Sequence, residues 1–254
     1  MNMNDITVMV VTHKNYEMPT DSMYVPIAVG PNKNNLKQYP LRDDAGENIA
    51  QKNDQYSELT AIYWAWKNLK SNYVGVVHYR RYMCVGKCKN LSGVLTNKQA
   101  KELLQTFDIL VVKPRKYIES VANHYINCHK SQHENCRKQL KIMSDVIHEI
   151  YPEYSESFYL VMNGHKAHMF NMFIMKKTDF DAYCAWMFPI LFKSEELILK
   201  NNVSYERLMG SLSEFLLDTW LVQNKKRIRE LNLYQTELDF FKRVKRFIYR
   251  RLFD

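Results

Sequence analysis

The sequence has few of the residues that build linkers and low-complexity segments. Its 254 residues include only seven glycines and seven prolines, and no repeat occurs at the periods typical of solenoids. Hydrophobic residues make up 46% and charged residues 25% of the chain, which is ordinary for a folded soluble protein. We therefore expect a compact protein that is large enough to bury a full hydrophobic core.

Long apolar runs and a regular cysteine framework are also missing. No apolar stretch reaches the length of a transmembrane helix, and residues 1–14 lack the basic and apolar segments of a secretory leader. The five cysteines are odd in number and irregularly spaced, which fits reduced thiols better than a disulfide framework. These features predict a cytoplasmic protein.

Positive charge is concentrated in the last thirty residues of a chain whose net charge is +9. Residues 225–254 contain ten Lys or Arg and four Asp or Glu. Within them, apolar residues recur at helical spacing over residues 238–253, with basic residues between them. We therefore expect a main domain at residues 1–224 and a basic amphipathic helical tail at residues 225–254.

Two positions for this tail are open. The apolar face can pack on the main domain, or the tail can lie on an anionic membrane surface, where each nearby Lys or Arg contributes about 1 kcal/mol. Nucleic acid is a weaker alternative, because the aromatic residues form no RNA-binding signature. We expect no nucleic-acid partner.

A buried strand followed by polar residues is the most informative stretch. The apolar run at residues 74–77 ends in His78, Tyr79, Arg80 and Arg81. Ligands of open α/β sheets bind beyond the carboxyl ends of the strands, and neighbouring arginines offer planar forks that suit a diphosphate. The alternative is a solvated turn whose arginines pair with surface acids.

Other strands end in a similar way. Residues 6–11 read as a buried strand followed by Thr12, His13 and Lys14, and residues 109–112 read as another strand. Helical patterns alternate with these strands, which favours a mainly parallel sheet with helices on its faces. The polar segment between the second strand and the next helix holds more candidate ligands than a connector needs: Asp43, Asp44, Asn48, Lys52 and Asn53.

Two polar residues stand in apolar surroundings further along the chain. Asn171 lies within an expected strand at residues 170–175, where an unpaired amide is costly, so it must meet either the fold or a ligand. Glu214 lies in an expected helix at residues 205–223. It is either a solvated residue, as most glutamates are, or a functional one.

A zinc site is a weaker possibility in the helical segment at residues 118–150. His and Cys residues are frequent there, namely His124, Cys128, His129, His133 and Cys136. Their spacing is not that of a finger or ribbon, and no CxxC or HExxH motif accompanies them. We expect surface histidines and structural thiols instead of a metal site.

Several stretches together resemble a family of bacterial glycosyltransferases of capsular polysaccharide or exopolysaccharide biosynthesis, formerly a domain of unknown function. The resemblance extends over about residues 6–224. It rests on VTHK at 11–14, YVPIAVG at 24–30, GENI at 46–49 with Lys52 and Asn53, ELTAIYWAWKN at 58–68, VGVVHYRRYM at 74–83, HMFNMFIMKK at 168–177 and LSEFLLDTWL at 212–221. The family implies an α/β fold of the GT-A type, a nucleotide-sugar-binding sandwich, here with a C-terminal helical extension.

The resemblance also implies an activity. The protein is expected to transfer a hexose, such as galactose in pyranose or furanose form, from a UDP-sugar to a lipid-linked saccharide in capsule, O-antigen or exopolysaccharide synthesis. This work would take place at the inner face of the cell membrane. The alternative is a non-catalytic saccharide-binding module of a polysaccharide assembly complex.

The resemblance further suggests roles for particular residues. His78 and Arg80 stand where most GT-A enzymes hold a divalent metal with two carboxylates, and neither side chain suits a hard cation. No metal or other cofactor is therefore expected, and Arg80 and Arg81 would stabilise the departing diphosphate, with Arg80 contributing more than Arg81. Inversion is the expected outcome of the transfer, and retention is the alternative. An inverting enzyme needs a carboxylate base; Glu214 is the first candidate, followed by Asp43 or Asp44. The expected contacts to the donor are Thr12, His13, Lys14, Asp44, Asn48, Lys52, Asn53, Arg81, His168 and Asn171.

Overall fold

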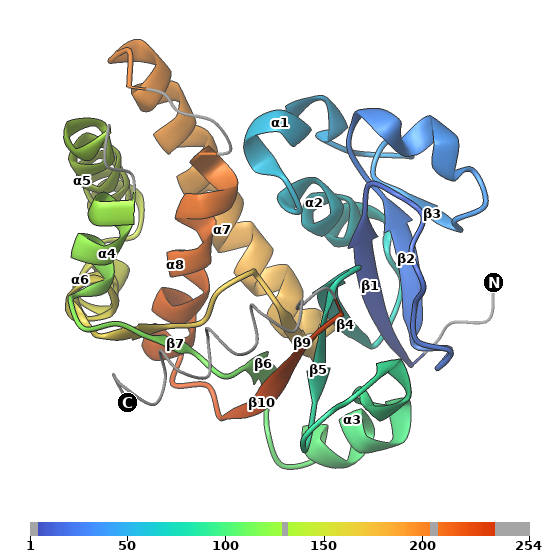
Figure 1. Cartoon of the computed structure of the whole chain (residues 1–254). Coiled ribbons are helices and arrows are strands. Elements are labelled where there is room, and N and C mark those ends of the chain that lie inside the picture. The colour runs from blue at the N-terminus through green and yellow to red at the C-terminus, as the bar shows by residue number, and fades with distance from the viewer. Residues whose placement is uncertain (1–4, 129–131, 204–207, 237–254) are drawn as a thin grey trace.

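The computed structural model describes residues 5–128, 132–203 and 208–236 (Figure 1). The strands are β1 Ile6–Thr12, β2 Tyr24–Ala28, β3 Leu41–Arg42, β4 Tyr73–His78, β5 Arg81–Cys84, β6 Ile109–Val112, β7 Arg115–Lys116, β8 Lys166–Ala167, β9 Phe173–Lys176 and β10 Ile228–Gln235. The α-helices are α1 Asn53–Tyr56, α2 Leu59–Asn68, α3 Asn97–Leu104, α4 Val121–Cys128, α5 His133–Ile150, α6 Ser155–Asn163, α7 Lys177–Lys200 and α8 Leu208–Gln223. Short 3₁₀ turns occupy Pro31–Leu36, Ala50–Lys52, Leu91–Gly93 and Pro152–Tyr154.

The main sheet is mixed and partly closed. Its strand order is β3-β2-β1-β4-β5-β10-β6-β9, and β9 also pairs with β4, so the last five strands form a ring. Strands β1 to β4 and the pair β6–β10 run parallel, whereas β5 and β9 run antiparallel to their neighbours. The mainly parallel arrangement expected from the sequence is therefore found only in β1 to β4, the first half of the sheet. A tight hairpin between β4 and β5 reverses the chain at His78 and Arg81, which face each other.

Strand β1 is at the centre of the first half, and all seven of its residues are buried. Met9 and Val11 belong to the core on one face of the sheet, together with residues of α2, α7 and α8. Val8 and Val10 belong to the core on the other face, which α3 covers. Both faces of β1 are thus buried, which explains its continuous apolar sequence. Its register with β4 sets Val11 opposite His78, so the two strands end at the same level.

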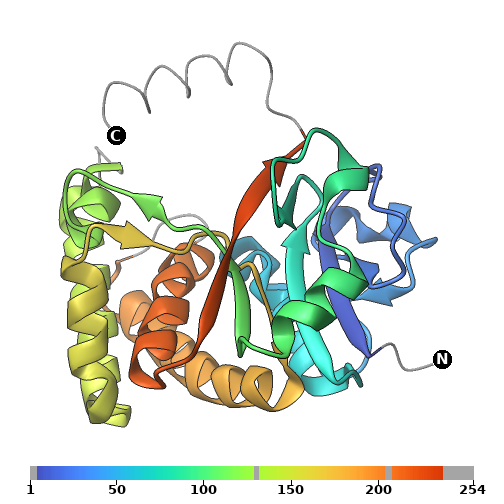
Figure 2. The ribbon, with the colours of Figure 1, turned by 90° about the horizontal axis from the view of Figure 1, so that it is seen from below.

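Helices α4, α5 and α6 form a group at the opposite end of the molecule from β1, β2 and β3 (Figure 1). Helices α4, α5 and α6 pack on one another, and α5 and α6 pack on α7 and α8 respectively. The small ribbon of β7 and β8 leads from the sheet to this group, as Figure 2 shows. None of the helices in the described ranges has both the length and the apolar character needed to cross a membrane.

Strand β10 changes the domain boundary expected at residue 224. It lies between β5 and β6 in the ring, and Leu231 at its centre is buried. Arg229 and Glu230, which precede this leucine, are more exposed. Because the segment is rich in such charged residues, its strand was not predicted from the sequence. Residues 228–235 are part of the sheet instead of a helical tail. The amphipathic segment at residues 238–253 lies outside the described residues.

Candidate active site

The ends of β1 and β4 lie side by side, because the two strands pair in parallel with Val11 opposite His78. The ring of His13 contacts the ring of Tyr79 edge-on, with 5.2 Å between their centroids. The Lys14 ammonium lies 5.3 Å and the Arg80 guanidinium 4.8 Å from the centre of the same tyrosine ring. Thr12 has a local role, because its buried hydroxyl donates a 2.6 Å hydrogen bond to the Lys14 carbonyl. This corner therefore gathers three cationic or titratable side chains around Tyr79.

His78 connects the β4–β5 hairpin to a segment that is distant in sequence. Its Nε2 atom lies 2.7 Å from the carbonyl oxygen of Phe170. Because a carbonyl only accepts, Nε2 carries the hydrogen. Burial lowers the pKa of His78, against the nearby Glu58 charge, and keeps the imidazole neutral. His78 thus acts as a donor that fixes the position of Phe170.

The segment before β9 has an unusual backbone. Phe170 and Asn171 have φ angles of 79° and 50°, a left-handed conformation that is uncommon for residues other than glycine. The strand expected at residues 170–175 therefore begins later, at Phe173. Two consecutive residues keep a left-handed conformation only where surrounding contacts stabilise it. Backbone strain of this kind is concentrated at functional sites.

Helix α8 provides most of the contacts that hold this segment. The Glu214 carboxylate accepts the Phe170 N–H at 2.9 Å, and the Asn171 side chain donates to the Ser213 hydroxyl at 2.9 Å. One turn further along α8, the Asp218 carboxylate accepts the backbone N–H of His168 at 2.8 Å and also contacts its ring Nδ1. His168 is buried by these contacts, with its Nε2 3.6 Å from Glu230.

Asn171 is only partly satisfied by the fold. Its amide group also donates to Glu58 Oε1 at 2.8 Å. Its carbonyl oxygen Oδ1 is buried and has no hydrogen-bond partner among the described residues. An acceptor in this state is suited to a hydroxyl or N–H group of a ligand. The fold therefore provides partners for the Asn171 amide group, and a ligand can provide one for its Oδ1 atom.

Two arginines flank the ring of Phe170. The guanidinium of Arg81 lies 4.3 Å and that of Arg115 lies 4.6 Å from the ring centre. Arg81 is half-buried, and its Nε atom has no hydrogen-bond partner within the described part of the chain. Burial and the like charges of Arg80 and Arg115 lower the pKa of Arg81, but a guanidinium stays charged. The site therefore concentrates positive charge where an anion can bind.

Two carboxylates lie beside these arginines. Burial, reinforced by the charge of Glu58, raises the pKa of Glu214 to about 8, while the Phe170 N–H and the charges of Arg115 and Arg81 act in the opposite direction. Glu214 is therefore largely protonated at neutral pH. Glu58 precedes α2, where the helix dipole favours a negative charge.

The sequence did not single out Glu58 or Arg115 as site residues. Glu58 stands in the ELTAIYWAWKN stretch, which contributed to the family resemblance without a role for the glutamate. Arg115 follows the end of strand β6, so the pattern that drew attention to His78 and Arg81 was present there as well. The two were missed because only the folded chain brings them to the Phe170 segment.

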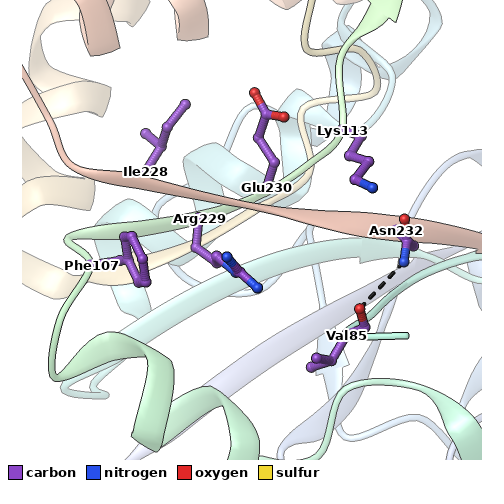
Figure 3. Close-up of a pocket in the computed structure, with 7 residues that line it drawn as sticks. All are labelled: Val85, Phe107, Lys113, Ile228, Arg229, Glu230 and Asn232. Carbon is purple, nitrogen blue, oxygen red and sulfur yellow. Dashed lines mark hydrogen bonds between the residues drawn. The ribbon is translucent and has the colours of Figure 1, made fainter. Parts of the chain in front are cut away.

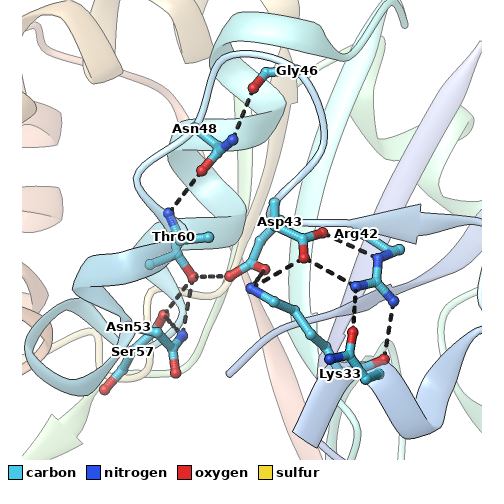
Figure 4. Close-up of polar contacts among 11 residues, drawn as sticks. Lys33, Arg42, Asp43, Gly46, Asn48, Asn53, Ser57 and Thr60 are labelled. Carbon is cyan, nitrogen blue, oxygen red and sulfur yellow. Dashed lines mark hydrogen bonds and ion pairs between the residues drawn. The ribbon is translucent and has the colours of Figure 1, made fainter. Parts of the chain in front are cut away.

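Asp43 belongs to another cluster (Figure 4). Its buried carboxylate accepts a hydrogen bond from Thr60 Oγ1 at 2.7 Å and forms an ion pair with Lys33 at 3.0 Å. Burial raises the pKa of Asp43, against the stabilising effect of these two partners. Asp44 is more exposed and pairs with Arg42 at 2.9 Å, and that hydrogen bond lowers its pKa. Both carboxylates thus link the loop after β2 to its surroundings.

The remaining predicted contacts have structural partners. Asn48 bonds to the backbone of its own turn, and Lys52 pairs with Glu195 of α7 at 2.7 Å. Asn53 donates to the Ser57 carbonyl and to Thr60. It also stands against Gly30, where an added Cβ would lie 3.1 Å from Asn53 Oδ1. Asn53 is therefore near the end of β2 and the β1 corner, whereas Asn48 and Lys52 are engaged elsewhere.

A pocket of about 430 Å³ lies beside β10 (Figure 3). Its lining residues are Val85, Phe107, Lys113, Ile228, Arg229, Glu230 and Asn232. None of the site residues predicted from the sequence lines it. We place the candidate active site at the arginines and carboxylates around Phe170, because charge, burial and strained backbone converge there. Within the described ranges, no three His, Cys, Asp or Glu side chains gather as a metal site would require, and His129 lies outside those ranges.

The fold is that of a known class of enzyme. Among solved structures, it is similar to the apo structure of WbbM, a bifunctional glycosyltransferase, with a TM-score of 0.77 and 26% sequence identity over 92% of this chain. The chain spans 46% of that protein's chain. Residues 7–225 match the family described as a domain of unknown function, DUF4422, and the chain belongs to this family. A comparison with curated proteins finds no match.

The contacts of Asn171 predict its contribution to stability. Replacing it by alanine removes the donor to Glu58 and Ser213, and we expect Asn171→Ala to lower the free energy of unfolding by about 1–3 kcal/mol. The control is Asn202→Ala, since exposed Asn202 has a similar φ of 52°. Urea unfolding followed by circular dichroism measures both. Equal losses in the two variants would show that the backbone conformation, and not the buried amide, sets the cost.

Proposed function

We propose that this chain is a glycosyltransferase of the GT-A type that moves a sugar from a nucleoside diphosphate donor to a saccharide acceptor. The observation that carries the proposal is the half-buried Arg81, which stacks on Phe170 with Arg115 beside the carboxylates of Glu58 and Glu214. Fixed cations next to a titratable carboxylate supply the two groups that sugar transfer needs, one for the leaving diphosphate and one for the acceptor proton. The similarity to WbbM supports the same class of reaction.

The donor is proposed to extend from the β1 corner to the arginines. His13 and Tyr79, with Asn53 nearby, would accommodate the nucleoside, and the diphosphate would reach Arg81 and Arg115. Arginine forks stabilise the charge that develops on the departing diphosphate without a change in their own position. On this proposal, fixed positive charge takes the part that a divalent metal has in other enzymes of this fold.

Glu214 is the proposed base. The acceptor hydroxyl attacks the anomeric carbon as the bond to the diphosphate oxygen breaks, and the Glu214 carboxylate takes the hydroxyl proton. Attack on the face opposite the leaving group inverts the configuration. Glu58 is the alternative base, because its carboxylate lies in the same cluster and accepts the Asn171 amide.

The finer identity of the substrates rests on the family resemblance. A UDP-hexose is the proposed donor, and a lipid-linked saccharide of capsule, O-antigen or exopolysaccharide synthesis is the proposed acceptor. The basic amphipathic pattern at residues 238–253 supports a peripheral position at an anionic membrane surface, close to such an acceptor.

Release of nucleoside diphosphate from a panel of nucleotide sugars, with saccharide acceptors and with or without a chelator, tests this function. We expect turnover with at least one donor and no loss of turnover in the chelator, because the arginines carry the charge stabilisation. Loss in the chelator and recovery with Mn²⁺ would contradict metal independence. Saccharide binding without turnover of any donor would instead indicate a binding module.

Arg81 is expected to contribute more than Arg80, which reverses the expectation from the sequence. Arg80 lies over Tyr79, whereas Arg81 lies among the carboxylates. Arg81→Ala should lower kcat by roughly 100-fold or more, as removal of a preorganised stabiliser does, and Arg80→Ala by less. The control is Arg227→Ala on the surface, where Arg227 pairs with Asp108. A folded Arg81→Ala protein with near-normal turnover would remove Arg81 from the mechanism.

The pKa of Glu214 predicts a pH dependence. A base acts only when deprotonated, so kcat/KM should rise with pH, by roughly tenfold between pH 7 and pH 9 for a pKa of about 8. Glu214→Gln keeps an acceptor for the Phe170 N–H but cannot take a proton, and it should show low turnover at every pH. Glu58→Gln is the matched variant. If Glu58→Gln abolishes the rise and Glu214→Gln preserves it, the base is Glu58.

A further inference from the structure

Three side chains outside the candidate active site form a linear arrangement at α4. The Cys128 sulfur lies 3.3 Å from His124 Nε2, and His124 Nδ1 lies 3.3 Å from Glu119 Oε1. His124 and Cys128 are four residues apart, so they share one face of the helix. The other oxygen of Glu119 accepts a hydrogen bond from the Asn127 side chain at 2.5 Å, which fixes the carboxylate.

The imidazole is also held from the side. Its ring stacks on Tyr117 with 4.1 Å between the centroids and 28° between the planes. Tyr117 is in turn fixed by a 2.8 Å hydrogen bond from its N–H to the His165 carbonyl. His124 therefore presents one nitrogen to a carboxylate and the other to a thiol. A nucleophile, a base and a group that orients the base are the parts of an activated nucleophile.

Exposure separates Cys128 from the other cysteines. Cys84, Cys136 and Cys184 are buried, and Cys88 is partly buried. The Cys88 thiol has no histidine as its partner; it donates to the Asn90 carbonyl at 2.8 Å. Cys128 is exposed and lies against an imidazole. The chain thus contains both a candidate reactive thiol and a natural reference thiol.

We propose that Cys128 is an activated thiol that exchanges with small disulfides and becomes a mixed disulfide. His124 takes the thiol proton, and the Cys128 sulfur attacks one sulfur of the incoming disulfide. A new S–S bond forms as the original S–S bond breaks, and the departing thiolate receives the proton from His124. Cys128 is oxidised, and the other half of the small disulfide is reduced to a thiol. Glu119 is a positioning residue that orients the imidazole.

The test uses the whole protein and an aromatic disulfide whose released thiolate absorbs visible light. Peptide mass spectrometry assigns the adducts after short reactions at neutral pH. We expect Cys128 to react at least roughly tenfold faster than Cys88 in the unmodified sequence, since Cys128 is exposed and the neighbouring imidazole can accept its proton. Equal rates at Cys128 and Cys88 in the wild-type protein would overturn the proposal.

Two variants test the roles of the partners. His124→Gln and Glu119→Gln are each expected to slow the reaction of Cys128 toward the Cys88 rate while leaving Cys88 unchanged. Adducts at buried Cys84, Cys136 or Cys184 would reveal unfolding, in which case the wild-type ratio of Cys128 to Cys88 decides. An unaltered Cys128 rate in a folded His124→Gln protein would overturn the role of the imidazole.

Discussion

The site depends on the hydrogen bonds between α8 and the left-handed segment that precedes β9. Glu214 and Asp218 accept backbone N–H groups from this segment, and Ser213 accepts the Asn171 amide. These bonds oppose the unfavourable backbone conformation at Phe170. They also set the position of the Phe170 ring, on which the two arginines rest. A helix that is buried over most of its length therefore fixes the charged groups by way of a strained loop.

The same arrangement couples structure and charge. Glu214 holds the loop with one oxygen, yet burial and Glu58 make its ionised form unfavourable. Arg81 and Arg115 oppose this effect, but burial and the like charges of Arg80 and Arg115 lower the pKa of Arg81. Positive and negative groups are thus close enough at this site to influence one another's pKa. An anion that binds the arginines would reduce their support for the Glu214 carboxylate, so donor binding and the proton affinity of Glu214 are linked.

Sequence reasoning succeeded where local pattern determines structure. The buried strands that end at Thr12 and His78 were predicted from apolar runs and polar endings, and the structure places those endings together. It failed where distant contacts decide. Phe170 and Asn171 read as strand residues because their left-handed conformation depends on helix α8, and Glu58 joins the site only through a contact 113 residues away in sequence. The charge of the segment around Leu231 likewise outweighed its strand pattern.

The position of β10 has a consequence for the synthesis of the protein. The Cys84 thiol of β5 donates a hydrogen bond to the Asn232 carbonyl of β10, and the two residues lie 148 positions apart in the sequence. Until β10 leaves the ribosome, the edges of β5 and β6 that it will occupy keep unpaired N–H and C=O groups, which can pair with other chains. The earlier strands β1 to β4 have nearby partners and can associate first. The ring of the sheet can therefore close only after residues 228–235 have been synthesised, well after the two strands on either side of them.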